Sequence, residues 1–265
     1  MNVRAMAAAA WGYRGFVASS IANEFRTRLA RSRLGVAWLV LQPLAQTIVF
    51  ATILSKVLAA RLGGIDNPYG YAIYLLAGIA CWSLFSEVLQ RCTTVFVDQA
   101  SLLRKVNFPR ITLPLVVGGS ALVGNACLVS VLVVAALLAG FDASWAWAWL
   151  PLLMSVTVAL AMGIGLLLGT LHVFARDVGQ VLAVVLQFWF WATPIVYSPE
   201  VVPKGFARVL AMNPVTPLVR AYQDVILRAQ SPDPSLWLAV VVALVFLALA
   251  LFVFRRASAE LVDAL

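Results

Sequence analysis

The sequence predicts an all-α integral membrane protein, on three observations. Its 265 residues are 63% hydrophobic and only 11% charged, which is far from the composition of a soluble domain. The apolar residues form runs of about 20, the length that crosses a bilayer, and about six such runs occur. Basic residues gather beside alternate ends of these runs, as they do on the cytoplasmic side of membrane proteins.

The chain begins with a basic segment that leads into the first apolar run. Arg26, Arg28, Arg31 and Arg33 precede the run that starts at Leu34. This pattern is typical of a helix that lies on the cytoplasmic membrane surface and turns into a spanning helix. We therefore expect a cytoplasmic segment at residues 1–33 with an amphipathic interface helix, and a transmembrane domain at residues 34–265. The first 15 residues lack a clear cleavage site, so no signal peptide is predicted.

The apolar runs define the expected spans and their orientation. An even number of spans returns the C-terminus to the cytoplasm. Most cations of the connections, such as Arg91, Arg104, Arg110 and Arg176, then lie on the inner side, which agrees with the positive-inside rule. The predicted spans are residues 34–57, 71–89, 111–139, 145–173, 178–197 and 236–254.

The inner connection, residues 93–109, mixes apolar and charged residues and ends at an Asn-Phe-Pro stop. It predicts a short amphipathic helix parallel to the membrane, at about residues 94–106. Two interpretations are equally favoured by composition. The helix seals the bundle from below, or it fits a cleft in a cytoplasmic partner.

The outer connection, residues 198–234, contains six prolines and two pieces of helical character, residues 204–212 and 217–229. In the second piece Arg220, Asp224 and Arg228 recur every four residues and form one charged face. Neither piece is long enough to span a bilayer. We expect re-entrant half-helices between the fifth and sixth spans, which membranes tolerate only where protein or a wet cavity surrounds them.

Several kinds of chemistry are excluded by missing motifs. The sequence has no P-loop, HExxH or GxSxG motif, so we expect no ATP hydrolysis by this chain and no enzyme activity. Cys81, Cys92 and Cys127 are too few and too dispersed for a disulfide framework or a metal site. His172 stands alone and is expected to be structural. No metal is predicted.

Ionisable residues within the spans are candidates for transport chemistry. Glu87 lies four residues before Arg91, so a structural ion pair is favoured over a proton relay. No carboxylate lies at mid-membrane, as an ion-coupled carrier usually requires. The net charge of +8 is carried beside apolar runs, which favours anionic lipid over nucleic acid as its partner.

Aromatic side chains gather in the second and fifth spans. Aromatic faces stack on sugar rings and impose little directionality, so a channel lined by them suits a polymer of sugars. A packed protein core is an equally favoured explanation. The candidate channel residues are Tyr71, Tyr74, Trp82, Phe85, Phe188, Trp189, Trp191 and Tyr197.

The motifs together resemble a known family. The run RLARSRLGVAW at residues 28–38, with Pro43 after it, resembles the R-Y-x-x-S-x-L-G-x-x-W…P signature of permease subunits of polysaccharide-exporting ABC transporters, the Wzm and TagG type. Leu29 stands where the family often has Tyr, which puts a local packing contact in doubt. The resemblance continues in order through LRKVNFP at 103–109, RD at 176–177, TPIVY at 193–197 and NPVTP at 213–217.

This resemblance implies an assembly and a substrate. Two permeases form a homodimer, and two cytoplasmic ABC ATPase subunits bind ATP and Mg, so this chain needs no cofactor. The substrate is an undecaprenyl-pyrophosphate-linked glycan, as in O-antigen and lipopolysaccharide biosynthesis, a capsule or a teichoic acid, crossing the bacterial inner membrane. The alternative is a permease of the same architecture for a small hydrophobic compound or drug. A membrane-embedded glycosyltransferase is disfavoured because no metal-binding or nucleophile constellation occurs.

The resemblance also implies roles for two groups of residues. One group contacts the ATPases through the coupling and interface helices, and the other forms an outer gate of half-helices at about residues 199–230. The ATPase-coupling residues are Gln99, Leu102, Leu103, Arg104, Lys105, Arg28, Arg31 and Arg33, and the gate residues are Lys204, Arg208, Arg220, Asp224 and Arg228.

Overall fold

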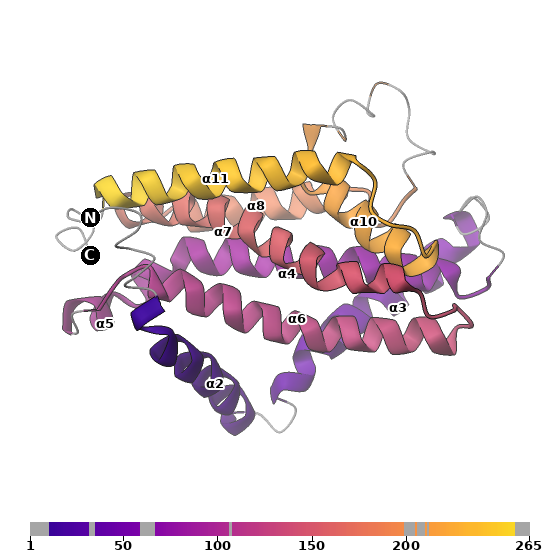
Figure 1. The fold of residues 1–265 in the computed structure, drawn as a ribbon, viewed down its shortest axis with the longest axis horizontal. Helices are drawn as coiled ribbons and strands as arrows, with labels where there is room; N and C mark the ends of the chain where they lie inside the picture. Colours follow the sequence, from indigo (N-terminus) through magenta and orange to yellow (C-terminus); the bar gives the residue numbers. More distant parts are fainter. Residues whose placement is uncertain are drawn as a thin grey trace.

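The computed structural model describes residues 11–31, 35–58, 67–105, 108–198, 205, 210 and 212–257, and this part of the chain contains helices and no strand. Figure 1 shows most of the helices running along one axis, as a bundle. The elements are α2 (Arg14–Arg31), η1 (Gly35–Ala37), α3 (Trp38–Leu58), α4 (Gly70–Asp98), α5 (Ala100–Lys105), α6 (Thr112–Leu138), η3 (Trp145–Trp149), α7 (Leu150–Phe174), α8 (Val178–Trp191), α10 (Thr216–Leu227) and α11 (Ser235–Ala257).

Four helical segments of the described chain are long and apolar enough to cross a membrane. They are Gly70–Asp98, Thr112–Leu138, Trp145–Phe174 and Ser235–Ala257, while Trp38–Ile53 and Val178–Trp191 are shorter apolar helices. The prediction of an all-helical integral membrane protein is therefore confirmed. The count of six crossings stays a prediction, because two of the expected spans correspond to the shorter helices.

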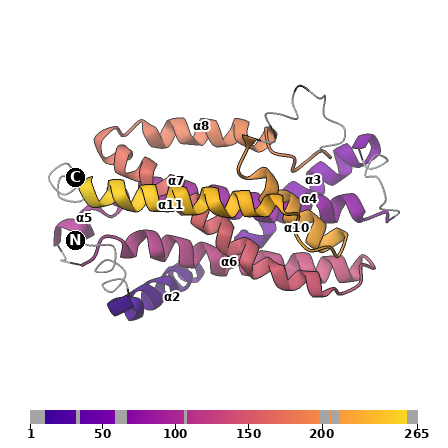
Figure 2. The same cartoon turned by 45° about the horizontal axis from the view of Figure 1, so that its top comes forward.

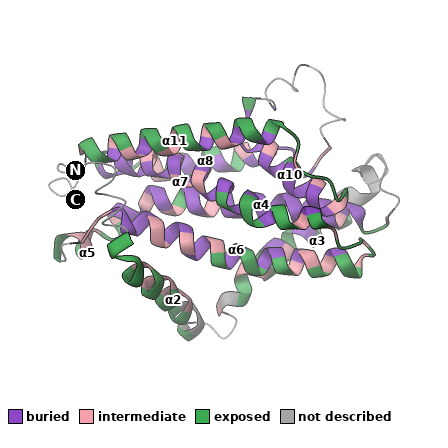
Figure 3. Ribbon diagram, in the orientation of Figure 1, coloured by how far each residue is buried: buried purple, intermediate pink, exposed green. Residues whose placement is uncertain are grey.

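Helix α4 is the centre of the bundle. It packs against α3, α6, α7, α8 and α10, and Figure 3 shows most of α4 and α7 buried while α2 is largely exposed. Glycines on α7 allow the close approach of α4. A Cβ atom on Gly169 would lie 2.6 Å from the backbone oxygen of Cys92, and one on Gly165 would lie 2.7 Å from the Cβ of Cys92. Small residues at such crossings let helix backbones pack closely in membranes.

Two predicted boundaries need correction. The second span was expected to end at Leu89, but α4 continues to Asp98, because no Gly or Pro interrupts it and its last turns are buried. Residues 94–98 therefore belong to α4 rather than to the predicted coupling helix, and the separate helix α5 begins at Ala100. The fifth span was expected to reach Tyr197, but α8 ends at Trp191, since a residue before proline, here Thr193 before Pro194, disfavours helix.

The predicted amphipathic pieces lie at opposite ends of the bundle. Figures 1 and 2 both place α5 at the end where α11 finishes and α10 at the other end. The last turn of α11 carries Arg255 and Arg256, and α5 ends in Arg104 and Lys105. Cations therefore gather at one end of the described bundle.

Helix α10 corresponds to the second predicted half-helix, with Pro217 in its first turn as expected. Its apolar face, which includes Leu218 and Tyr222, is fully buried against α4, α7 and α11. Asp224 and Arg228 form an ion pair of 3.0 Å on its other face. Its 12 residues are too few to span a bilayer, and its re-entrant position stays a prediction. Most of the first predicted half-helix lies outside the described residues.

Candidate functional site: a polar groove between α3, α4 and α8

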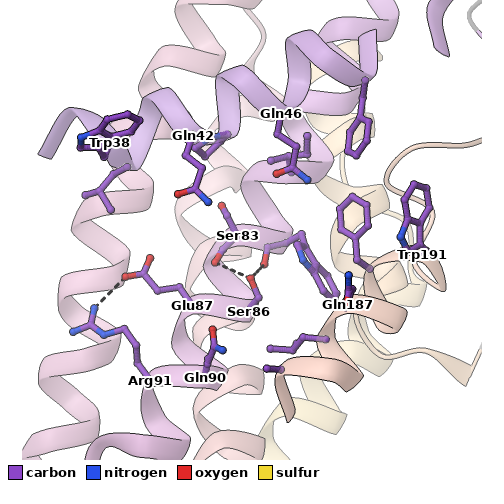
Figure 4. A pocket seen from close by; sticks show the side chains of 18 of the residues that line it. Trp38, Gln42, Gln46, Ser83, Ser86, Glu87, Gln90, Arg91, Gln187 and Trp191 are labelled. Atoms are coloured by element: carbon purple, nitrogen blue, oxygen red, sulfur yellow. Dashed lines mark hydrogen bonds and ion pairs between the residues drawn. The ribbon is translucent and has the colours of Figure 1, made fainter. Parts of the chain in front are cut away.

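A cavity of about 780 Å³ opens between three helices that are distant in sequence, α3, α4 and α8, and is called here the α3–α4–α8 groove (Figure 4). Figure 2 shows α8 along the edge of the bundle, so α8 forms an outer wall of the groove. The lining residues are Gly35, Trp38, Leu39, Gln42, Pro43, Gln46, Phe50, Ile79, Trp82, Ser83, Ser86, Glu87, Gln90, Arg91, Ala183, Leu186, Gln187, Phe190 and Trp191.

Helix α4 supplies a polar stripe to the groove. Ser83, Ser86, Glu87, Gln90 and Arg91 lie on one face because they are spaced at three to four residues, the helical repeat. The Ser86 hydroxyl donates a hydrogen bond of 2.8 Å to the backbone oxygen of Trp82. The Ser83 hydroxyl donates to the oxygen of Ala80 at 3.1 Å. Each serine oxygen can still accept a hydrogen bond from a ligand.

Amide side chains complete the polar lining. Gln42 and Gln46 are one helical turn apart on α3, and Figure 4 shows them opposite the α4 serines. Gln187 comes from α8. All three amides are exposed in this chain. Each amide offers two donors and an acceptor, which matches the hydroxyl groups of a sugar.

One end of the groove is aromatic. Phe50 of α3 stacks on Phe190 of α8 with ring centroids 6.1 Å apart. Trp82 of α4 meets Phe190 edge to face at 5.7 Å. Trp191 is 53% exposed and packs at 6.1 Å from Phe50. The groove therefore offers rings as well as hydrogen-bonding groups.

The other end is ionic. Arg91 forms an ion pair of 3.1 Å with Glu87 on its own helix, so the predicted pair is confirmed. Arg91 also bonds Glu24 of α2 at 2.8 Å and donates to the hydroxyl of Ser120 on α6 at 3.1 Å. These contacts fix α2 and α6 to α4 beside the groove. The contact with Glu24 was not predicted, because only the fold brings together residues 67 positions apart.

The predicted channel residues divide into two groups. Trp82 and Trp191 line the groove. Tyr71 and Tyr74 are buried, and their hydroxyls donate to the backbone oxygens of Val196 and Tyr197 at 2.8 and 3.0 Å. These tyrosines hold the non-helical segment after α8 against α4.

The remaining channel candidates also lie outside the groove lining. Phe85 is fully buried and packs edge to face on Trp189 at 5.2 Å. The indole of Trp189 donates to the side-chain oxygen of Asn213 at 3.0 Å. Phe188 is 71% exposed. The Tyr197 hydroxyl donates to the backbone oxygen of Trp191 at 3.0 Å.

The predicted coupling residues of the inner connection lie in α5 and in the turn before it. Gln99 is exposed in the turn between α4 and α5, where its backbone oxygen accepts a hydrogen bond from the N–H of Leu103 at 3.0 Å. Leu102 and Leu103 are half-buried against the core, whereas Arg104 and Lys105 are exposed. The surface of α5 is therefore basic and faces away from the bundle.

The other predicted interface and gate residues are only partly described. Arg28 and Arg31 lie within α2, and Arg33, Lys204 and Arg208 lie outside the described residues. Arg220 is exposed on α10, on the same side as Asp224 and Arg228.

Sequence reasoning missed most of the polar lining. The spacing of Gln42 and Gln46 in an otherwise apolar run was an available signal, and so was Gln187 within the apolar run of α8. Such side chains are costly at membrane depth unless they have partners or meet water. The aromatic residues of these segments are more numerous and mask this signal.

The long apolar helices define an integral membrane protein, and α3, α4 and α8 enclose a partly polar groove beside its core. The chain belongs to the ABC-2 type transporter family, whose sequence model matches residues 17–227, from α2 to the end of α10. It is thus a transport subunit. The predicted family resemblance is confirmed.

The chain is similar to two O-antigen export permeases. The chain is 26% identical over 249 residues to the O-antigen export system permease protein RfbA of Myxococcus xanthus, which covers 92% of this chain and 94% of that protein. It is 22% identical over 204 residues to the O-antigen export system permease protein RfbA of Klebsiella pneumoniae, with 76% of each chain covered. The first match extends over nearly the whole length of both proteins.

Proposed function

We propose that this chain is the permease subunit of an ATP-driven ABC exporter that moves lipid-linked polysaccharide across the bacterial inner membrane. The observation that carries the proposal is the α3–α4–α8 groove, which combines amides, hydroxyls and aromatic rings beside apolar helices. Sugars present hydroxyls at their edges and C–H groups on their faces, and these groups match amides and rings respectively. The similarity to two O-antigen export permeases supports the same substrate class.

Two copies of the chain form the complete passage in this proposal. The helices that flank the groove expose large apolar side chains, among them Ile48 and Ile53 of α3 and Val184 and Phe188 of α8. A second copy would cover part of these faces and would place two grooves opposite each other. Homodimers with a twofold axis are the commonest arrangement of such self-complementary surfaces.

The energy for export comes from two separate ATPase subunits that bind ATP and Mg. Helix α5 supplies the surface for them, with Leu102 and Leu103 anchored against the core and Arg104 and Lys105 exposed. This end of the bundle would be cytoplasmic, because cations favour that side. Both termini would lie there too. Helix α10, at the opposite end, would contribute to an outer gate.

Deleting the gene in its own bacterium tests this proposal. We expect a surface polysaccharide to disappear and its lipid-linked form to accumulate inside the cell, and a plasmid copy of the gene to restore export. An affinity tag on the chain should recover an ATPase subunit from detergent-solubilised membranes. An unchanged set of surface polysaccharides, with a loss of resistance to a hydrophobic compound, would support the small-compound exporter instead.

A further inference from the structure

A second cavity, of about 400 Å³, lies between α7, α8, α10 and α11. Helix α11 supplies one wall through Leu238, Ala239, Val242 and Phe246, and α8 supplies Trp189. We propose that this cavity, called here the α8–α11 cavity, binds one acyl chain of a phospholipid of the surrounding bilayer. The inference goes beyond the proposed function and does not depend on which compound the permease exports.

The hydrogen-bonding side chains of the described lining, Trp189 and Asn213, already have protein partners. The indole N–H of Trp189 donates to Oδ1 of Asn213 at 3.0 Å, and the same oxygen accepts from the backbone N–H of Val215 at 3.0 Å. The amide nitrogen of Asn213 donates to the backbone oxygen of Ala192 at 3.2 Å and to the hydroxyl oxygen of Thr193 at 2.9 Å. A buried water needs several polar partners, and an apolar cavity without them stays dry. The lining therefore favours a hydrocarbon over water or a polar ligand.

The cavity lies at the depth of the hydrocarbon of a bilayer. Helix α11 is long and apolar enough to cross a membrane. Its lining residues, between Leu238 and Phe246, lie roughly 5–16 Å along the helix from its start, given the rise of an α-helix per residue. That range falls within one leaflet of a hydrocarbon core about 30 Å thick. The lining also includes Met212 and Leu238, which are exposed large apolar side chains, so an acyl chain can enter from the side.

The α8–α11 cavity and the α3–α4–α8 groove lie on different sides of α8. Gln187 and Trp191 line the groove, whereas Trp189 lines the cavity. Residues two positions apart point in nearly opposite directions on an α-helix. The lipid carrier of a polymer that occupies the groove would therefore be separated from this cavity by α8, and the phospholipids of the bilayer are the hydrocarbon available to it.

An acyl chain in the cavity would stabilise the packing of the outer helices. Apolar walls that face an empty space lose their van der Waals partners, and a chain that fills the space restores them. A ligand that binds only the folded protein also raises its melting temperature. The bound chain should therefore be retained on purification and should stabilise the protein.

The native mass spectrum of the purified full chain in detergent tests the proposal. We expect one retained phospholipid per chain, identified by its mass after release. Val242→Trp fills the cavity and should lower the lipid-bound fraction severalfold. The matched control is Val241→Trp, since Val241 is exposed on the same helix but lies outside the cavity lining, and it should retain the lipid. A retained polyprenyl phosphate in place of phospholipid, no retained lipid, or equal retention by the two variants would overturn the proposal.

A second measurement uses the unmodified chain. The protein is stripped of lipid in detergent, and either dioleoylphosphatidylethanolamine or its deacylated headgroup, glycerophosphoethanolamine, is added. The melting temperature should rise with the phospholipid and stay unchanged with the headgroup, because the acyl chain is the part that binds. A rise with the headgroup alone, an equal rise with both, or no rise with either would contradict this. Neither measurement involves export, so this inference and the proposed function can fail separately.

Discussion

Arg91 joins three helices beside the groove. It bonds Glu24 of α2, Glu87 of α4 and Ser120 of α6, and the side chains of Arg91 and Glu24 are only 28% and 23% exposed. A hydrogen bond to a charged group contributes about 1.5–3 kcal/mol, more than a bond between neutral groups. This network therefore holds α2 and α6 against α4, the centre of the bundle.

Arg91→Met should reveal that role. The change removes the guanidinium that bonds Glu24, Glu87 and Ser120, so we expect the unfolding free energy in detergent to fall by about 2–3 kcal/mol and α2 to become sensitive to protease. The control is Arg228→Met, which removes the exposed pair with Asp224 and should cost about 0.5 kcal/mol or less. Equal thermal stability of the two variants would show that the Arg91 network does not stabilise the fold.

At the scale of elements, the crossing of α4 and α7 depends on glycine. Gly169→Ala would place a methyl group against the Cys92 carbonyl oxygen, so the helices must separate, and overpacking of this kind costs about 1–3 kcal/mol. Gly15→Ala in α2 meets no atom within 4 Å and should be neutral or slightly stabilising, since Ala favours helix. Detergent melting curves of the two variants measure the difference, and equal midpoints would contradict the packing argument.

The proposed coupling role of the short helix α5 can be tested separately from folding. Leu102→Glu with Leu103→Glu replaces its half-buried anchors, so we expect at least a tenfold loss of export while the purified subunit still folds. ATP hydrolysis should continue without transport. The control is Ser101→Glu, because Ser101 is exposed on the same helix and should retain export. Normal export by the double variant would remove α5 from the coupling role.

Most helices could be predicted from the sequence, but the ends of α4 and α8 could not. The predicted span 111–139 matches α6 to within one residue at each end, and the predicted span 145–173 covers η3 and α7 together, since length and hydropathy decide these segments. The extension of α4 to Asp98 depends on the burial of Val95 and Phe96 against other helices, which no local pattern reports. Pro194 indicates that α8 ends early, but the apolar aromatic run just before it favours a longer span.

The site was harder to predict than the fold. Composition could not separate channel aromatics from core aromatics, and the structure places Trp82 and Trp191 in the groove but Tyr71 and Tyr74 in the core. Whether an aromatic side chain of α4 lines the groove or is buried in the core depends on which helices pack against its face of α4. The groove itself needs α3, α4 and α8 together, so no segment of sequence encodes it alone.

For the whole molecule, the central claim is that the polymer passes along the α3–α4–α8 groove. Replacing both Ser83 and Ser86 with Trp fills the groove from α4 without adding charge, and Ser130→Trp, on an exposed site of α6, is the matched control. The measurement is the amount of surface polysaccharide per molecule of permease in the deletion strain. The account predicts a loss of at least tenfold for the double variant, with normal protein levels and normal recovery of the ATPase, and no loss for the control. Export equal to wild type by the double variant would contradict it.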